Sequence, residues 1–391
     1  MTTRRVGVGV VGAGWMGHVH ARAYVRVPHH YPDLELRPVL VAVSDVSPAS
    51  AADALDRYGF ARAYPDWHDL VADPDINVVS VTLPNALHRE VGAAVAAQGK
   101  HLWIEKPVGL SAADAEAVAH ALAAAGVVAA VGFNYRNVPA VAHARELVAS
   151  GAIGEVTHAR VRMFTDYAAD PRGMLSWRFV RERGGNGVLG DLMSHAVDLT
   201  RFVIGELSAL TAQTARFIDE RPLASAPGSH YATIDEITAT TPMGAVENDD
   251  YAVALARTST GAFVVLEASR AAVGDQNAYG FEVHGTRGQV SWDFRRPGEL
   301  QVASGASYLD LPTTRVMAGP GHGVYALFQP GSGIATSYDD TKVIEAANLL
   351  MSIAAGAQPV AGLHDAVMAA RALDAMERSA ADGSWVDLTS G

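Results

Sequence analysis

The sequence predicts an α/β protein of two domains, in which an N-terminal parallel sheet is followed by a large, mostly antiparallel one. The chain has 391 residues, more than one typical domain holds. Over residues 1–132, short apolar runs alternate with alanine-rich stretches, an order typical of a doubly wound parallel sheet. After Gly132, several runs alternate apolar and polar residues, as strands do when one face meets water. We therefore place the domains at residues 1–132 and 133–391.

Five apolar runs of the first domain lack polar alternation, which is typical of strands buried on both faces. They cover residues 6–11, 39–44, 77–83, 101–105 and 127–132. Between them we expect helices over residues 17–26, 49–58, 85–98 and 111–125. Ser111 is a favourable N-cap residue ahead of an acidic first turn, which supports the last of these helices.

The second domain opens with a helix expected over residues 139–150, with Gly151 as its C-cap. Alternating runs predict strands at 157–164, 251–257, 262–268, 279–284 and 289–294. Residues 221–249 are rich in Pro, Ser, Thr and Ala and have no clear period, so they predict a long loop. Two further helices, at 342–355 and 363–379, complete an α/β domain with a large open sheet.

Composition excludes several classes of function. The formal net charge of -12 argues against nonspecific nucleic-acid binding; it fits solubility and is also compatible with a cationic substrate such as an aminosugar. The chain has no cysteine, which excludes disulfides, thiolate metal sites and cysteine nucleophiles. The apolar run at 6–11 is too short for a signal peptide, and no run of 18 apolar residues occurs. We expect a cytoplasmic protein with no membrane or nucleic-acid partner.

Three glycines follow the first strand and open the first helix. Gly12 permits a tight turn, Gly14 lets the backbone approach a pyrophosphate, and Gly17 allows the helix to pack closely on the strand. The free N–H groups at the helix start, near Trp15 and Met16, would face the phosphates. The pattern predicts a Rossmann dinucleotide-binding domain.

Asp45, at the end of the second strand, indicates which dinucleotide is bound. A carboxylate there can accept hydrogen bonds from both ribose hydroxyls of NAD. The next residues, Val46, Ser47 and Pro48, carry no positive charge that could receive a 2′-phosphate. The predicted cofactor is NAD rather than NADP.

Candidate catalytic residues fall in two places. Lys106 ends the fourth strand, at the sheet edge where ligands bind, and could stabilise an alkoxide; alone, it would more often be a surface lysine. Asp191 and His195 are spaced i,i+4 on an expected helix, so the carboxylate would back a histidine that accepts a proton. A zinc site is the alternative, but no third ligand has suitable spacing, and no metal is predicted.

The ordered motifs 12–17, 84–88 (Pro-Asn-Ala-Leu-His), 105–107 (Glu-Lys-Pro) and 191–195 resemble the glucose–fructose oxidoreductase/inositol dehydrogenase family over essentially the whole chain. The resemblance implies an NAD-dependent dehydrogenase, a homodimer or homotetramer built on the open sheet, and a catalytic set of Lys106, Asp191 and His195. It also implies a cis peptide before Pro107. The cofactor contacts that it implies beyond the glycine turn are Leu83, Pro84, Asn85, His88, Glu105 and Lys106. The family has Thr or Ser where this chain has Leu83, which leaves only a backbone contact there.

Local strings are similar to members of this family that oxidise the C3 hydroxyl of a pyranose with NAD. They place the substrate-pocket candidates at Tyr135, Asp166, Trp177 and Arg178. Each has a structural alternative, such as core packing for Trp177 or a carboxylate partner for Arg178. A tailoring dehydrogenase for aminosugars or aminoglycosides and an inositol dehydrogenase are the alternative enzymes.

The hypothesis is hydride transfer from a secondary alcohol carbon of a sugar or cyclitol. His195 would take the hydroxyl proton, Asp191 would orient His195, and Lys106 would hold the oxygen. Lys106 would be the base instead if burial lowered its pKa enough. A non-catalytic NAD-binding sensor is the rival from another class, but it would not need all three residues.

Overall fold

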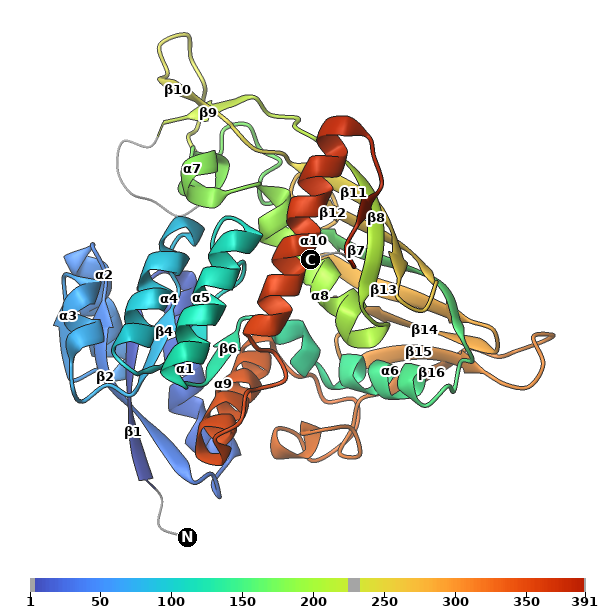
Figure 1. Cartoon of the computed structure of the whole chain (residues 1–391), viewed down its shortest axis with the longest axis horizontal. Coiled ribbons are helices and arrows are strands. Elements are labelled where there is room, and N and C mark those ends of the chain that lie inside the picture. The colour runs from blue at the N-terminus through green and yellow to red at the C-terminus, as the bar shows by residue number, and fades with distance from the viewer. Residues whose placement is uncertain (1–3, 224–232, 390–391) are drawn as a thin grey trace.

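The computed structural model describes residues 4–223 and 233–389, which form two large sheets and a two-stranded one, with helices between and around the large sheets (Figure 1). The first is a six-stranded parallel sheet with the order β3-β2-β1-β4-β5-β6. The second has nine strands in the order β16-β15-β14-β13-β7-β12-β11-β8-β17, and every neighbouring pair except β12 and β7 is antiparallel. This arrangement confirms the predicted fold class.

The strand order of the N-terminal sheet reverses between β1 and β4, and dinucleotides bind at such a switch point. Its strands are β1 (Arg4–Val11), β2 (Leu36–Ser44), β3 (Arg62–Tyr64), β4 (Val78–Val81), β5 (His101–Ile104) and β6 (Ala129–Val131). All five predicted strands are present. The sequence did not indicate β3 and the helix α3 (Trp67–Ala72), because their short segments mix charged and aromatic residues without a period.

A helix from far along the chain completes the N-terminal core. The helices α1 (Trp15–His30), α2 (Pro48–Tyr58) and α9 (Tyr338–Ala355) share one apolar cluster with β1 and β2. The helices α4 (His88–Ala97) and α5 (Ala112–Ala125) pack in a second apolar cluster, which also includes residues of the nine-stranded sheet. Both α1 and α9 begin before their predicted starts, α1 inside the glycine turn and α9 at a capping box formed by Ser337 and Asp340.

The nine-stranded sheet shows the predicted period-two burial, and α8 (Ser194–Val203) and α10 (Leu363–Asp382) pack on it, with α10 also contacting α5 (Figure 1). The helix α6 (Pro139–Ala149) packs on its β14–β15 part. The strands are β7 (Val156–Phe164), β8 (Leu207–Ala215), β11 (Tyr251–Thr258), β12 (Phe263–Ser269), β13 (Ala278–Gly285), β14 (Gly288–Asp293), β15 (Glu299–Ser304), β16 (Thr314–Met317) and β17 (Val386–Asp387). Of these, β8 and β15–β17 were not predicted.

The expectation of a long loop over residues 221–249 is wrong in part. There β9 (Glu220–Pro222) pairs antiparallel with β10 (Met243–Ala245), while residues 224–232 lie outside the described residues. Arg221 is 1% exposed and donates hydrogen bonds to the carbonyls of Ala168, Asp170 and Gly173. A buried arginine, rather than an apolar period, therefore anchors this segment.

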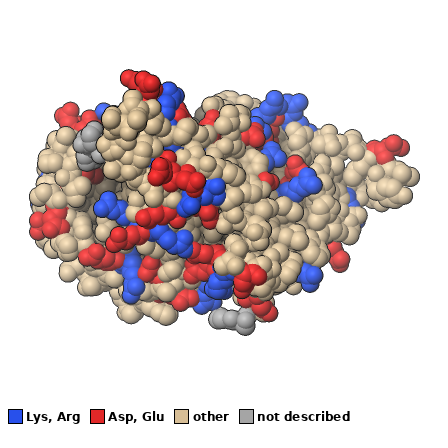
Figure 2. Space-filling model, turned by 90° about the horizontal axis from the view of Figure 1, so that it is seen from above, with Lys and Arg blue, Asp and Glu red and all other residues tan. Residues whose placement is uncertain are grey.

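Charged side chains of both signs are interspersed over the face of the molecule that Figure 2 shows, so the net negative charge is not gathered in one area there. None of the helices in residues 4–223 and 233–389 is both long and apolar enough to cross a membrane.

Candidate active site

The glycine turn is closely packed on one side and open on the other. Gly12 has φ +95°, and a Cβ added to Gly17 would lie 1.9 Å from the Gly12 carbonyl oxygen. A Cβ added to Gly14 would meet no atom within 4 Å. Thr82, which sequence reasoning missed, donates its hydroxyl to the carbonyls of Val11 and Gly12 at 3.0 and 2.8 Å. The open space at Gly14 is where a pyrophosphate would approach the backbone.

The start of α1 offers donors to this space. The first hydrogen bond of the helix runs from the His18 N–H to the Gly14 carbonyl, so the N–H groups of Trp15, Met16 and Gly17 precede the helical ladder. The side chains of Trp15 and Met16 both contact Tyr338 of α9. The Trp15 and Tyr338 rings stack with their centres 5.6 Å apart, and the Tyr338 hydroxyl lies 3.8 Å from Met16 Sδ.

Asp45 lies directly after β2 and is partly exposed. Its Oδ2 accepts a hydrogen bond from the Ala13 N–H at 2.7 Å, and its Oδ1 accepts one from the Ser47 N–H at 2.8 Å. The carboxylate therefore holds the glycine turn, and each oxygen keeps a lone pair for a further donor such as a ribose hydroxyl. The turn, the helix start and Asp45 together fit NAD.

Two alanine substitutions separate packing from cofactor binding. Gly17→Ala should lower the free energy of unfolding by about 1–3 kcal/mol, because its Cβ meets the Gly12 carbonyl. Gly14→Ala should change stability by less than about 1 kcal/mol, since Gly14 has φ −76° and an unobstructed Cβ position. Gly14→Ala should nevertheless weaken NADH binding by roughly tenfold or more. Thermal unfolding and NADH fluorescence titration measure the two effects; unchanged NADH affinity in Gly14→Ala would contradict this placement of the pyrophosphate.

Lys106 projects from the turn after β5, where the Lys106–Pro107 peptide is cis as expected. Its Nζ donates to the Asp191 carbonyl oxygen at 2.6 Å and lies 3.7 Å from Asp191 Oδ1. Burial lowers the pKa of Lys106, whereas the nearby Asp191 and Glu105 carboxylates oppose the shift. The predicted Lys106 and Asp191 are thus in contact.

Asp191 is the centre of a cluster of polar side chains. Its Oδ2 accepts a hydrogen bond from the Tyr167 hydroxyl at 2.5 Å, and its Oδ1 accepts one from Arg178 Nη1 at 3.2 Å. Burial alone would raise the pKa of Asp191, but Arg178, Lys106 and the Tyr167 hydroxyl outweigh it and hold that pKa below its ordinary value. No sequence signal distinguished Tyr167 from its neighbours.

The expected α-helical pairing of Asp191 with His195 is not what the structure shows. Residues Leu189–Met193 form a π-helix that runs into α8, so the α-helical i,i+4 geometry does not hold there. Within the described part of the chain, no hydrogen bond joins the two side chains. Asp198, on the same helix, instead pairs with the buried Arg136 at 2.5 Å.

His195 is 8% exposed and packs against aromatic rings. The Tyr135 ring lies edge-on to it at 4.7 Å, and the Phe133 ring lies at 6.4 Å. Burial, with a smaller contribution from Lys106, keeps the pKa of His195 well below its ordinary value. The imidazole is therefore neutral near pH 7 and able to accept a proton.

The four substrate candidates lie in different surroundings. The Arg178 guanidinium lies 4.5 Å from the centre of the Trp177 ring, so these two neighbours are stacked beside Asp191. Tyr135 is 6% exposed within a group of rings that includes Phe294. Asp166 follows β7, and its carboxylate accepts no hydrogen bond from the residues that the structure describes.

Several predicted cofactor residues are bound within the protein. Asn85 donates from Nδ2 to the Gly184 carbonyl at 3.1 Å. The ring nitrogens of His88 lie 2.7 and 2.9 Å from the carbonyl oxygens of Pro107 and Leu83, so this buried ring connects the turns after β4 and β5. Pro84, which follows Leu83 in the sequence, is the N-cap of a 3₁₀ turn over Asn85–Leu87. The Glu105 carboxylate is also buried, and it pairs with Lys342 and His20.

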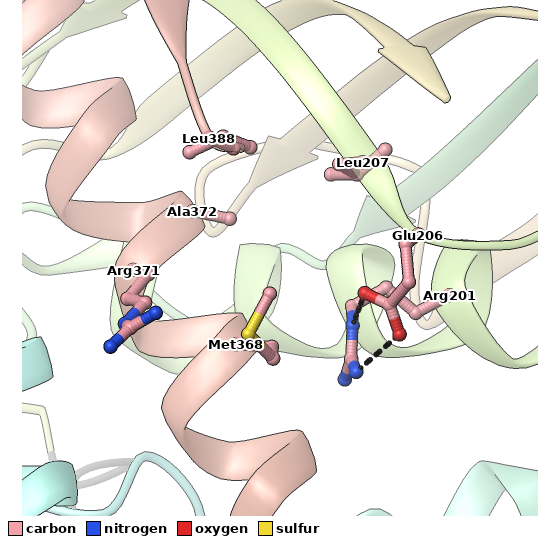
Figure 3. A pocket seen from close by; sticks show the side chains of 7 residues that line it. All are labelled: Arg201, Glu206, Leu207, Met368, Arg371, Ala372 and Leu388. Atoms are coloured by element: carbon pink, nitrogen blue, oxygen red, sulfur yellow. Dashed lines mark hydrogen bonds and ion pairs between the residues drawn. The ribbon is translucent and has the colours of Figure 1, made fainter. Parts of the chain in front are cut away.

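A small pocket elsewhere carries none of this chemistry. Between α8, β8 and α10, it is lined by Arg201, Glu206, Leu207, Met368, Arg371, Ala372 and Leu388 (Figure 3). Arg201 and Glu206 form a forked ion pair with each other there, with N–O distances of 2.7 Å. In residues 4–223 and 233–389, no group of three or more His, Asp or Glu side chains is placed to hold a metal ion.

Comparisons with known proteins agree with this architecture. Residues 6–133 match the model of an oxidoreductase family with an NAD-binding Rossmann fold, and residues 141–291 match the GFO/IDH/MocA C-terminal domain. The levoglucosan dehydrogenase of Pseudarthrobacter phenanthrenivorans is 36% identical over 98% of both chains. A levoglucosan dehydrogenase structure, in complex with NADH and levoglucosan, is 35% identical, covers 99% of this chain and 100% of its own, and has a TM-score of 0.91.

A more distant structure, GenD2 from gentamicin A biosynthesis in complex with NAD, is 26% identical with a TM-score of 0.75. It covers 100% of this chain and 98% of its own. The two family models, the 36% identity over nearly the full length and the glycine turn agree on one assignment. The chain belongs to the GFO/IDH/MocA family of oxidoreductases and carries that family's NAD-binding Rossmann domain.

Proposed function

We propose that this protein oxidises the C3 hydroxyl of a pyranose sugar or glycoside with NAD. The observation that carries the proposal is the cluster of Lys106, Asp191, Arg178 and Tyr167. Lys106 follows β5 at the same edge of the parallel sheet at which the glycine turn follows β1. The near full-length similarity to levoglucosan dehydrogenase supports the substrate class. When bound, NAD takes the hydride from the carbinol carbon, which becomes a ketone as the hydroxyl proton leaves.

In this proposal the chain supplies a base and a positive charge. His195 takes the hydroxyl proton, because its buried imidazole is neutral near pH 7. The Lys106 ammonium group donates a hydrogen bond to the substrate oxygen and stabilises its developing negative charge. Asp191, held by Tyr167 and Arg178, positions Lys106 rather than His195, since its contacts are to Lys106.

Local charge favours a neutral sugar over an aminosugar. Two cations, Lys106 and Arg178, lie against the Asp191 carboxylate, so an ammonium group on the substrate would meet positive charge there. The net charge of -12 describes the whole surface and does not alter this local balance. Asp166, whose carboxylate accepts no hydrogen bond among the described residues, would receive hydrogen bonds from sugar hydroxyls.

The assembly proposed with this function is a homodimer or homotetramer built on the open face of the nine-stranded sheet. Apolar side chains on this face are partly exposed, including Phe263 at 42% and Leu255 at 39%. Burying them against a second copy would remove apolar surface from water. Light scattering of the purified protein measures the oligomeric state.

A substrate panel followed at the NADH absorbance band tests the proposal. Neutral pyranosides should reduce NAD faster than cyclitols or aminoglycosides, and NADP should be a poorer acceptor than NAD. Product analysis by NMR would locate the ketone, expected at C3. If NAD bound tightly and no compound of the panel were oxidised, the protein would be an NAD-binding sensor instead.

A further inference from the structure

A buried group of charged side chains contacts Glu105, the residue that precedes Lys106. Lys342 of α9 is fully buried, with Nζ 2.5 Å from Glu105 Oε1 and 3.2 Å from Glu345 Oε1. His20 of α1 is also fully buried, and its Nε2 lies 3.0 Å from the same Glu105 oxygen. The proposed reaction uses none of Lys342, Glu345 or His20, so this buried charge cluster needs its own explanation.

The choice of residue at 342 is informative. The chain contains only three lysines, Lys100, Lys106 and Lys342, and its other basic side chains with a permanent charge are arginines. Removing an ammonium group from water is costly, and a well-packed apolar residue in its place is often as stable or more so. A lysine at this fully buried position therefore points to a role that requires its charge.

Glu105 links this charge to the site. Its N–H donates to the Val81 carbonyl at the end of the parallel sheet, and the next residue is Lys106. A Cβ added to Gly132 would lie 2.5 Å from Glu105 Oε2, so the carboxylate is packed on that side. Lys342 compensates the charge that this position buries.

We propose that Lys342 is a positioning residue for the reaction: by neutralising Glu105, it fixes the turn that presents Lys106 to the substrate. The inference rests on the proposed function for its catalytic readout. Helix α9, from the C-terminal part of the chain, thereby acts on a catalytic lysine of the N-terminal domain without touching substrate.

Lys342→Met tests the proposal, with Val343→Ala as the matched control. Val343 is the next residue of α9 and is fully buried in the same apolar core, so its truncation weakens helix packing without changing charge. Lys342→Met should lower kcat on the order of 100-fold with little change in KM for NAD, because a small displacement of a catalytic group is costly. Val343→Ala should lower the Tm and leave kcat within about twofold of the wild type.

The double variant Glu105→Gln/Lys342→Met removes both charges and should regain at least about tenfold in kcat over Lys342→Met, because the two residues act as a pair. If Lys342→Met is too unstable to purify, the double variant is compared with Glu105→Gln alone, in which Lys342 has lost its nearest partner. The double variant should then have a kcat at least as high as that of Glu105→Gln. A slower double variant in either comparison, or Lys342→Met with the kcat of Val343→Ala, would overturn the proposal.

Hydrogen exchange provides a readout that needs no substrate. The backbone amides of residues 104–106 and of Val108 should exchange faster in Lys342→Met than in Val343→Ala, because only the former releases the turn. If no sugar were oxidised by the wild type, the proposed function would fail while this measurement still tested the positioning role. Equal exchange at these amides in the two variants would contradict that role.

Discussion

Lys106→Ala is expected to lower kcat for sugar oxidation by about 10²–10³-fold while NADH still binds with nearly wild-type affinity. The ammonium group is fixed by its hydrogen bond to the Asp191 carbonyl and lies 3.7 Å from that residue's carboxylate. Its removal therefore deprives the developing alkoxide of a preorganised donor. Steady-state NADH formation and NADH fluorescence titration measure the two quantities.

Lys100→Ala is the matched control, since Lys100 is also a buried lysine of the N-terminal domain. Its Nζ donates to the Asp73 carbonyl at 2.5 Å, outside the Asp191 cluster. Losing that bond should lower the Tm and leave kcat unchanged. Equal turnover in Lys106→Ala and the wild type would remove Lys106 from the catalytic set.

His195→Asn is expected to lower kcat by about 10²–10⁴-fold, because asparagine cannot take the hydroxyl proton. The substitution keeps a polar side chain of moderate size against Tyr135, so a large Tm change is not expected. If His195→Asn stayed active and Lys106→Ala did not, Lys106 would be the base.

The pH profile of the wild type follows from the same histidine. A base must be unprotonated to act, and burial, with help from Lys106, lowers the pKa of His195 well below 6.5. The kcat for oxidation should therefore stay near its plateau at pH 6.5 and fall only at more acidic pH. His195→Asn should lose this acidic limb. A wild-type midpoint at or above pH 6.5 would contradict a buried, neutral base.

Much of the fold is readable from local patterns. Except for β3, the strands of the N-terminal sheet were predictable from their apolar runs, which indicate burial on both faces. The strands β7 and β11–β14 were predictable from runs of period two, which indicate burial on one face. The glycine turn was predictable because the positive φ of Gly12 and the contact of Gly17 with the Gly12 carbonyl are local features, whereas the contact of Gly12 with Thr82 is not. The weakly patterned β8, with its alanines and threonines, was not.

The contacts of the site depend on residues far apart in the sequence. Tyr167 binds Asp191 and Lys342 binds Glu105 only because the fold brings separate segments together. The spacing of Asp191 and His195 predicted an α-helical pair, but a π-helical turn changes their relative direction. No local pattern in the chain signals that turn, and no periodicity reveals which partner a polar side chain finds.

The late position of α9 has a consequence for synthesis on the ribosome. Apolar residues of this helix, among them Leu349 and Leu350, belong to the same core as β1 and α1. The first 132 residues emerge long before them, so that face of the nascent nucleotide-binding domain stays uncovered while most of the chain is translated. The core that α9 shares with β1 and α1 can therefore be completed only after residue 355 has left the exit tunnel.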